Sequence, residues 1–335
     1  MALAPRPCPA CASRTTPAGC ELPEMMFGLG ERFDYLTCAD CASLFIREVP
    51  DDLAAYYSAP YYSLEVDPEV VLGRPGVKQL VALLGRSTLF GSGRVSRTAR
   101  VVPVRQLRTL VTLLESVRLA GLPGGRDTRV LDVGCGAGAL VFALGLAGMR
   151  SVTGVDPFLA ADRTLSTGAP VLRRTVDDLD GSFDLVMLHH SLEHVPDPGA
   201  TLEAVARRLS PDGRVLVRMP TVSSAAYERY GHDWIQLDPP RHLTLFSRAG
   251  METLARSTGF AVEAVADDSS SFQFWGSEQV RRGTSLMAPD SHFVNPSGSA
   301  FTRALLRAWD READELNRAG RGDQAAWVLR PVAAG

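Results

Sequence analysis

The sequence predicts an α/β protein built on a mainly parallel sheet, with a small cysteine-rich module at its N-terminal end. From Arg129 onward, short apolar runs alternate with helical segments, which is the pattern of a parallel α/β sheet. Residues 1–47 instead carry two Cys-x-x-Cys pairs and few large apolar residues. A length of 335 residues is typical of one large domain joined to smaller pieces.

The two cysteine pairs, Cys8 with Cys11 and Cys38 with Cys41, predict a bound metal ion. In a chain without a secretory signal, paired Cys-x-x-Cys motifs indicate metal ligands before disulfides. Zinc held by four thiolates would supply folding free energy to a module with so small a core. We therefore expect residues 1–47 to be a zinc ribbon with a structural Zn²⁺, the alternative being a redox pair.

Residues 48–103 are expected to form a linker of short helices and loops on the substrate side. Tyrosine pairs occur in its "AAYYSAPYYS". Between Val70 and Leu114 there are eight Arg or Lys residues and no Asp or Glu. Such a stretch favours either an acidic ligand or a solvated helix face. Apolar residues then recur at helical spacing up to Gly121, which predicts a helix starting near residue 104.

Residues 104–267 are expected to form the core, in which strands and helices alternate. The expected strands are "RVLDVG", "SVTGVDP", "FDLVMLHH", "RVLVRMP" and "FAVEAVADD", and the expected helices are "ALVFALGLAG", "PGATLEAVARRLSPDG" and "SRAGMETLARSTG". Residues 268–322 form an insertion, either a substrate pocket or a lid. In residues 323–335, "DQAAWVLRPV" supplies the last strand.

The stretch "LDVGCGAG" predicts a cofactor-binding loop. Gly134, Gly136 and Gly138 lie where a buried strand turns into a helix, so the backbone can approach a ligand closely and helix N–H groups point outward. Asp156 ends the next strand, where a carboxylate can accept hydrogen bonds from two ribose hydroxyls. The spacing departs from the GxGxxG of dinucleotide sites, and the leading Asp132 suits an ammonium group better than a pyrophosphate.

This loop resembles the first motif of class I S-adenosylmethionine-dependent methyltransferases. "GVDP", "FDLVMLHHSLEHVPDP" and "LSPDGRVLVRMP" are similar to later motifs of that family, in the same order. The resemblance implies a Rossmann-like seven-stranded sheet with an antiparallel last strand, and S-adenosyl-L-methionine as cofactor. It implies these cofactor-binding residues, the adenine contact being left open between Thr175, Asp177 and Asp178: Asp132, Gly134, Cys135, Gly136, Gly138, Asp156, Pro157, Thr175, Asp177, Asp178 and His189.

Five of the six histidines fall between His189 and His242. The order in "HHSLEH" does not match the HExxH of zinc enzymes, so we interpret His189 as a wall of the cofactor pocket. His194 follows the fourth strand, and His242 lies in a Pro-rich loop after the fifth. Both are expected to converge on the substrate, where an imidazole of near-neutral pKa is a natural base.

A cysteine module, a tyrosine-rich linker and a His-Leu-aromatic loop together resemble the zinc-containing sugar C-methyltransferases and their O-methylating relatives. That resemblance implies a substrate site formed by Tyr61 or Tyr62, His194 and His242, with His242 as the base. Arg241 departs from it, because the sugar enzymes carry Glu there; the chain also lacks their long C-terminal domain. We expect methyl transfer to a small molecule, a sugar or natural-product intermediate, including a nucleotide sugar or other acidic ligand.

Three other functions compete with this interpretation. They are a zinc-ribbon RNA methyltransferase, a noncatalytic cofactor-binding subunit of an assembly, and a dinucleotide-dependent oxidoreductase. The net charge of −3 argues against a nucleic-acid partner. The sequence shows neither a secretory signal nor a membrane-spanning stretch, so we expect a cytoplasmic protein without a membrane partner. Whether carbon, oxygen or nitrogen is methylated, and the oligomeric state, stay open.

Overall fold

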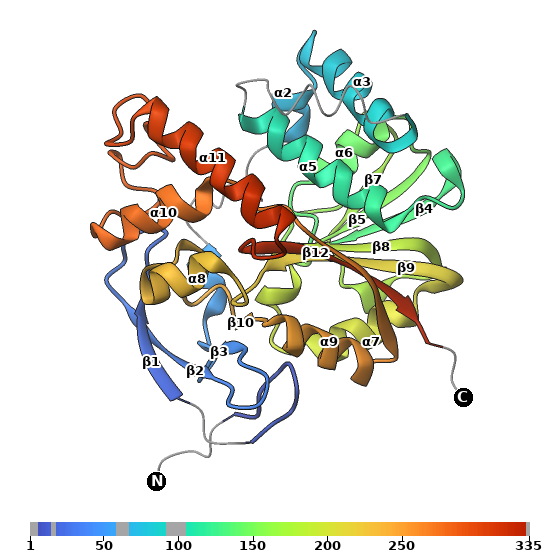
Figure 1. Cartoon of the computed structure of the whole chain (residues 1–335). Helices are drawn as coiled ribbons and strands as arrows, with labels where there is room; N and C mark the ends of the chain where they lie inside the picture. The colour runs from blue at the N-terminus through green and yellow to red at the C-terminus, as the bar shows by residue number, and fades with distance from the viewer. Residues whose placement is uncertain (1–5, 15–17, 58–66, 92–104, 333–335) are drawn as a thin grey trace.

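The computed structural model describes residues 6–14, 18–57, 67–91 and 105–332. Its centre is an eight-stranded sheet in the order β11-β12-β9-β8-β4-β5-β7-β6 (Figure 1). The strands are β4 (Arg129–Val133), β5 (Ser151–Val155), β6 (Arg163–Thr164), β7 (Pro170–Leu172), β8 (Phe183–His189), β9 (Leu209–Pro220), β11 (Phe260–Asp267) and β12 (Gln324–Pro331).

The topology confirms the expected fold class. Strands β7, β5, β4, β8 and β9 run parallel, and β12 lies antiparallel between β9 and β11. The predicted last strand is therefore the antiparallel one that the methyltransferase sheet requires. The sheet has one strand more than the seven expected, because the two-residue β6 pairs with β7 at the edge.

Helices cover both faces of this sheet (Figure 1). On one face lie α2 (Pro68–Leu72), α3 (Val77–Phe90), α5 (Arg105–Ala120) and α6 (Ala139–Leu146); on the other lie α7 (Pro198–Ala206) and α9 (Arg248–Ser257). The expected apolar face of α5 is buried, with Val111, Leu114 and Val117 fully enclosed. Each face thus has its own apolar core, the two being separated by the sheet.

The cysteine module shares a sheet with the core. Strands β1 (Ala18–Pro23), β2 (Arg32–Thr37) and β3 (Leu44–Ile46) form an antiparallel sheet whose last member is β10 (Thr244–Leu245), from the Pro-rich loop. The module also shares a third apolar core with the segments that follow β9 and β11. The module is therefore packed into the rest of the molecule and is not a separate domain on a linker.

Residues 221–322 supply the rest of that third core. They contain α8 (Ala225–Tyr230), α10 (Phe272–Arg281) and α11 (Arg303–Arg318). Phe274 of α10 stacks on Trp309 of α11, with ring centroids 6.1 Å apart. The short 3-10 turn η1 (Leu53–Tyr57) is the described part of the linker nearest the site. Over the described residues, the helices are all too short or too polar to cross a bilayer.

Candidate active site

A cavity of about 2000 Å³ opens at the carboxyl ends of the parallel strands. Its walls come from the glycine loop, the segment after β8, the cysteine module, η1, and the helices α10 and α11. This edge is where open α/β sheets bind ligands, and the volume suffices for a nucleoside cofactor together with an acceptor. Nine of the eleven predicted cofactor residues line the cavity, namely Asp132, Gly134, Cys135, Gly136, Asp156, Pro157, Thr175, Asp177 and His189.

The glycine loop between β4 and α6 needs its glycines. Gly134 has a φ of +74°, and a Cβ there would lie 2.5 Å from Cβ of Ser191. Gly138, with a φ of +86°, is the N-cap of α6, and its Cβ would lie 2.7 Å from a methyl of Val171. Gly138 does not itself line the cavity but allows α6 to begin close to the sheet. The loop is therefore a cradle that side chains would fill.

Asp156 holds this loop in place. One carboxylate oxygen accepts the backbone N–H of Gly136 at 3.0 Å, and the other accepts that of Phe158 at 2.9 Å. Burial raises the pKa of Asp156, and the pKa of Asp132 rises to about 7 because of burial and the charge of Asp156. In the described ranges, neither carboxylate forms an ion pair with Arg, Lys or His. Two buried acids without a cation suit a positively charged ligand such as a sulfonium amino acid.

The predicted adenine residues differ in their roles. Thr175 and Asp177 line the cavity, whereas Asp178 does not and instead accepts the Thr175 hydroxyl at 2.7 Å. Asp177 is paired with Arg207 at 2.7 Å. Both ring nitrogens of His189 are buried with no hydrogen-bond partner among the described residues, and burial holds its pKa well below the usual value. Such orphaned nitrogens fit a wall that meets a ligand.

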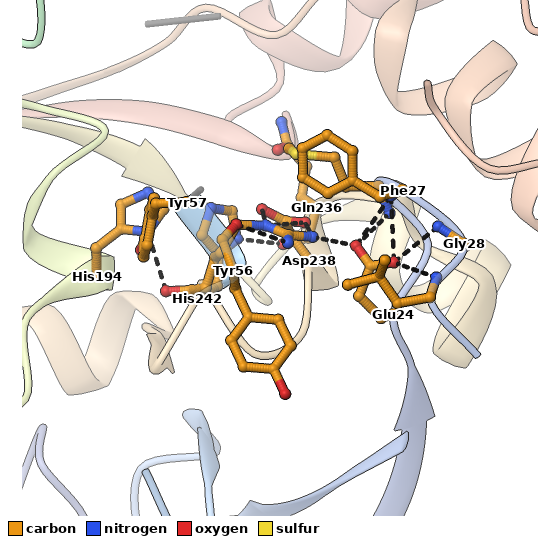
Figure 2. A network of polar contacts seen from close by, with 12 residues as sticks. Glu24, Phe27, Gly28, Tyr56, Tyr57, His194, Gln236, Asp238 and His242 are labelled. Carbon is orange, nitrogen blue, oxygen red and sulfur yellow. Dashed lines mark hydrogen bonds and ion pairs between the residues drawn. The ribbon is translucent and has the colours of Figure 1, made fainter. Parts of the chain in front are cut away.

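The structure brings His194 and His242 together in the cavity wall, with ring centroids 4.8 Å apart (Figure 2). Nδ1 of His194 lies 2.9 Å from the carbonyl oxygen of Arg241, and Nδ1 of His242 lies 2.7 Å from that of Gln236. A carbonyl oxygen only accepts, so both Nδ1 atoms carry the proton. In the neutral form of either ring, the free lone pair is therefore on Nε2.

Glu193 is fully buried, and its carboxylate lies within 4.8 Å of a ring nitrogen of both His194 and His242. Nη1 of Arg218 lies 2.8 Å from Nε2 of His190. Because an arginine only donates, Nε2 accepts and the ring proton is on Nδ1. Nδ1 of His190 lies 3.2 Å from Oε1 of Glu193. Burial alone would raise the pKa of Glu193, but His190 and the other nearby imidazoles lower it to about 2. Burial, and then the proximity of His242, lowers the pKa of His194 to about 4. The site thus combines the buried carboxylate of Glu193 with a neutral imidazole at His194.

The sequence analysis missed the tyrosine that contacts this pair. Tyr61 and Tyr62 lie outside the described residues, whereas Tyr57 places its hydroxyl 3.0 Å from Nδ1 of His194 and stacks on Phe158 at 5.7 Å. The same tyrosine-rich string contains Tyr57, so it was the available signal. Arg218 carried no comparable signal, because only the fold brings it to His190, whereas Glu193 follows His190 by three residues in "HHSLEH".

Four cysteines form a compact donor set at the far end of the module. Their sulfurs all lie within 4.8 Å of one another, with 3.7 Å between Cys8 and Cys41 and 3.6 Å between Cys11 and Cys38. Both turns have the same hydrogen bonds: the N–H of Cys8 meets the carbonyl of Ser13, as the N–H of Cys38 meets that of Ser43. Two matching turns that aim four sulfurs at one point fit a tetrahedral metal site.

The chain is similar to known methyltransferases. The model of a family described as "Methyltransferase domain" matches residues 105–265. A ubiquinone biosynthesis O-methyltransferase from Aromatoleum aromaticum is 32% identical over 165 residues, which are 41% of this chain and 68% of that protein. Its counterpart from Pseudomonas aeruginosa is 33% identical over 159 residues, 40% of this chain and 67% of that protein.

Among solved structures, the geranyl diphosphate C-methyltransferase of Streptomyces coelicolor A3(2) is 13% identical, with a TM-score of 0.48, and the match covers 84% of this chain and 97% of that one. The matched family model spans the glycine loop and the strands β4, β5, β8 and β9, and the relatives of the previous paragraph share an identity that establishes common ancestry. The chain belongs to the class I S-adenosylmethionine-dependent methyltransferases.

Proposed function

We propose that the protein transfers a methyl group from S-adenosylmethionine to a hydroxyl oxygen of a small-molecule acceptor, with His242 as the base. The observation that carries the proposal is the pair of imidazoles, His194 and His242, which line the same cavity as the glycine loop and have ring centroids 4.8 Å apart. An oxygen acceptor is supported by the relatives named ubiquinone biosynthesis O-methyltransferase.

Each group of the site has a role in this reaction. Bound S-adenosylmethionine would supply a methyl group on a positively charged sulfur, the electrophile for the acceptor oxygen. Asp132 and Asp156 would hold the cationic amino-acid end and the ribose, respectively. His242 Nε2 takes the hydroxyl proton, and the Gln236 carbonyl stabilises the resulting imidazolium at Nδ1. The buried carboxylate of Glu193 offsets that positive charge without a change of its own protonation.

The acceptor is best matched by a molecule with an apolar or aromatic body. Aliphatic and aromatic side chains from the module, η1, α10 and the segments around them form part of the cavity wall: Met25, Met26, Leu53, Ile235, Phe272, Trp275, Leu286, Phe293 and Leu306. The same wall also holds charged and polar side chains of α11, namely Arg303, Arg307, Asp310, Asp314, Asn317 and Arg318, so the cavity can accommodate a molecule with an apolar body and a polar or acidic group.

We also propose a structural Zn²⁺ at the four cysteines. Four sulfurs at mutual distances below 4.8 Å are the donor set that zinc prefers. The ion would stabilise the two turns and would take no part in the transfer itself, because the cysteines do not line the cavity.

The first experiment is calorimetric titration with S-adenosylmethionine, S-adenosylhomocysteine and NADH, together with elemental analysis. We expect both sulfur nucleosides to bind, NADH not to bind, and one zinc per chain. Binding of NADH alone would contradict the cofactor assignment, and metal-free protein with intact folding would contradict the zinc site.

The base is tested by turnover on phenols, catechols, aliphatic alcohols and nucleotide sugars. His242→Gln should lower the rate on an accepted hydroxyl compound by about 10²–10⁴-fold, which is the usual contribution of a general base. His232→Gln is the matched control, because His232 is exposed and lies outside the cavity wall. Full activity of His242→Gln would remove His242 from the mechanism.

A further inference from the structure

We propose that the cysteine module is a working part of the active site, with Glu24 and Arg241 as positioning residues that fix His242. This inference rests on the proposed function, in which His242 is the base. It goes further by assigning a role to a buried ion pair that joins two segments far apart in the sequence.

Arg241 is the centre of the connection. Its side chain is fully buried, and its guanidinium donates to Glu24 at 2.6 Å and to Asp238 at 2.6 Å. A third contact, at 3.4 Å, reaches the carbonyl of Tyr56. The guanidinium thus ties together the module, the linker and the loop of His242. A planar fork with five donors is the group that can make such a set of contacts at fixed angles.

Glu24, the partner of Arg241, is fixed by hydrogen bonds from the backbone of the module. Its side chain is fully buried between β1 and β2, and its two oxygens accept four consecutive backbone N–H groups, those of Met26, Phe27, Gly28 and Leu29. The N–H of Gly28 lies 2.8 Å from Oε2. A carboxylate fixed by four main-chain donors cannot follow a displaced arginine, so it acts as a rigid anchor on the module.

The backbone around His242 is attached to the module as well. The hydroxyl of Tyr35, on β2, donates to the carbonyl oxygen of His242 at 2.7 Å. The N–H of Ile46 donates to the carbonyl of Leu243 at 3.0 Å, and β3 then pairs with β10. The residues on both sides of the His242 imidazole therefore take their positions from the module.

The loop needs this support because its conformation is strained. Asp238 has a φ of +39°, in the left-handed region that a residue other than glycine seldom adopts. The carboxylate of Asp238 accepts from the same Nη2 of Arg241 that contacts Glu24, at 2.6 Å, and from Nε of Arg241 at 3.0 Å. Strain of this kind persists only where surrounding contacts enforce it. When the ion pair is lost, the loop from Gln236 to His242 can relax, and the imidazole leaves its place in the cavity.

The test compares Glu24→Gln and Arg241→Lys with a control, Arg129→Gln. Arg129 pairs with Asp184 at 2.7 Å where β4 and β8 begin, away from the cavity, so its loss removes an ion pair without touching the loop. Hydrogen exchange of peptides covering residues 236–247 reports the loop directly and needs no acceptor. Calorimetry with S-adenosylmethionine and turnover on an accepted hydroxyl compound separate cofactor binding from catalysis.

We expect faster exchange at residues 236–247 in Glu24→Gln, unchanged affinity for S-adenosylmethionine, and a fall in kcat of about 100-fold, the size of effect that a misplacement near 1 Å produces. Arg241→Lys keeps the positive charge, so its kcat should lie between that of Glu24→Gln and that of the wild type. Arg129→Gln should exchange and turn over like the wild type.

Two outcomes overturn the proposal: wild-type exchange and rate in Glu24→Gln, or losses in Arg129→Gln equal to those in Glu24→Gln. Its failure is distinguishable from that of the proposed function. If His242→Gln is inactive while Glu24→Gln is fully active, only the positioning role falls. If His242→Gln is fully active, the base assignment falls and the catalytic part of this inference falls with it.

Discussion

Asp132 is the residue whose protonation state most depends on what the cavity contains. Without a cation nearby, burial and Asp156 raise its pKa to about 7. A cationic ligand favours the ionised form and lowers that pKa again. At pH 6, below its pKa of about 7, most of the protein carries a proton on Asp132 that binding of S-adenosylmethionine must release.

The first prediction follows from this release of a proton from Asp132 when the cofactor binds. Titration with S-adenosylmethionine at pH 6, in two buffers of different ionisation enthalpy, should show proton release approaching one per site. Release should vanish near pH 9, where Asp132 is already ionised. Asp132→Asn should abolish the release and weaken binding. Heats that do not depend on the buffer at pH 6 would contradict the role of Asp132.

His194 makes the second residue-scale prediction, on stability. Its pKa is about 4 in the folded protein, below the usual value of about 6.5 that the unfolded chain has. Between these values the unfolded state binds more protons, so the free energy of unfolding falls as pH drops from 6.5 to 4. The full effect is about 3 kcal/mol.

The measurement is urea unfolding of the wild type and His194→Asn at pH 7 and pH 5. The variant should lose less stability between the two pH values than the wild type. The difference between the two slopes is the informative quantity, because the raised pKa values of Asp132 and Asp323 act in the opposite direction in both proteins. Parallel slopes would mean that His194 is not held neutral.

At the scale of elements, we expect the glycine loop between β4 and α6 to determine the affinity for the cofactor. Gly134→Ala should weaken binding of S-adenosylmethionine about 5- to 150-fold, because overpacking typically costs about 1–3 kcal/mol. Gly168→Ala is the matched control: its φ of +86° brings a similar backbone penalty, but its Cβ would meet no atom within 4 Å. Calorimetry on both variants checks this. Equal affinities in the two would show that the contact with Ser191 is unimportant.

The elements also separate what sequence can predict from what it cannot. The strands β4, β5, β8 and β9 and the turn at Gly134 follow from local apolar runs and glycine spacing, and the structure has them in the expected order. Strand β10 has two residues and exists only because β3 lies beside it. Because its pairing partner is about 200 residues away, β10 has no local pattern of apolar residues, and the sequence could not have predicted this strand.

The same reasoning applies within the candidate site. His194 and His242 were expected to approach one another because each follows the carboxyl end of a strand, and this edge gathers such residues. Glu24 and Arg241 are hydrophilic residues that a sequence reading assigns to the surface, yet both are fully buried. Their burial depends on each other, which is information that only the folded chain contains.

At the scale of the whole molecule, the active site lies where three cores meet. Two cores flank the sheet, and the third joins the cysteine module to α8, α10 and α11. Trp234 shows the connection: it is buried in the third core, and its indole N–H donates to Asp323 at 3.1 Å, next to the start of β12. The acceptor part of the cavity is therefore shaped by the module and the insertion together.

This architecture predicts how the molecule responds when the cysteine site is broken. Cys38→Ser removes one sulfur from the turn that leads into β3. The turn contacts the core directly, since the N–H of Ser247 donates to the hydroxyl of Ser43 at 3.0 Å. Loosening should therefore spread from the turn through β3 to β10 and to the start of α9. Helices α3 and α5 belong to the opposite core and should be unaffected.

Hydrogen exchange of Cys38→Ser and of the chelator-treated wild type measures this spread. We expect faster exchange in residues 18–46 and 241–250, wild-type rates in α3 and in α5, and a lower Tm for the module than for the sheet. Cys20→Ser is the control, because Cys20 lies on β1 and outside the four-sulfur cluster. Uniform loosening of the whole chain would mean that the module and the sheet unfold as one unit. Changes confined to residues 18–46 would mean that the module does not support the loop of His242, and that catalysis owes nothing to the metal site.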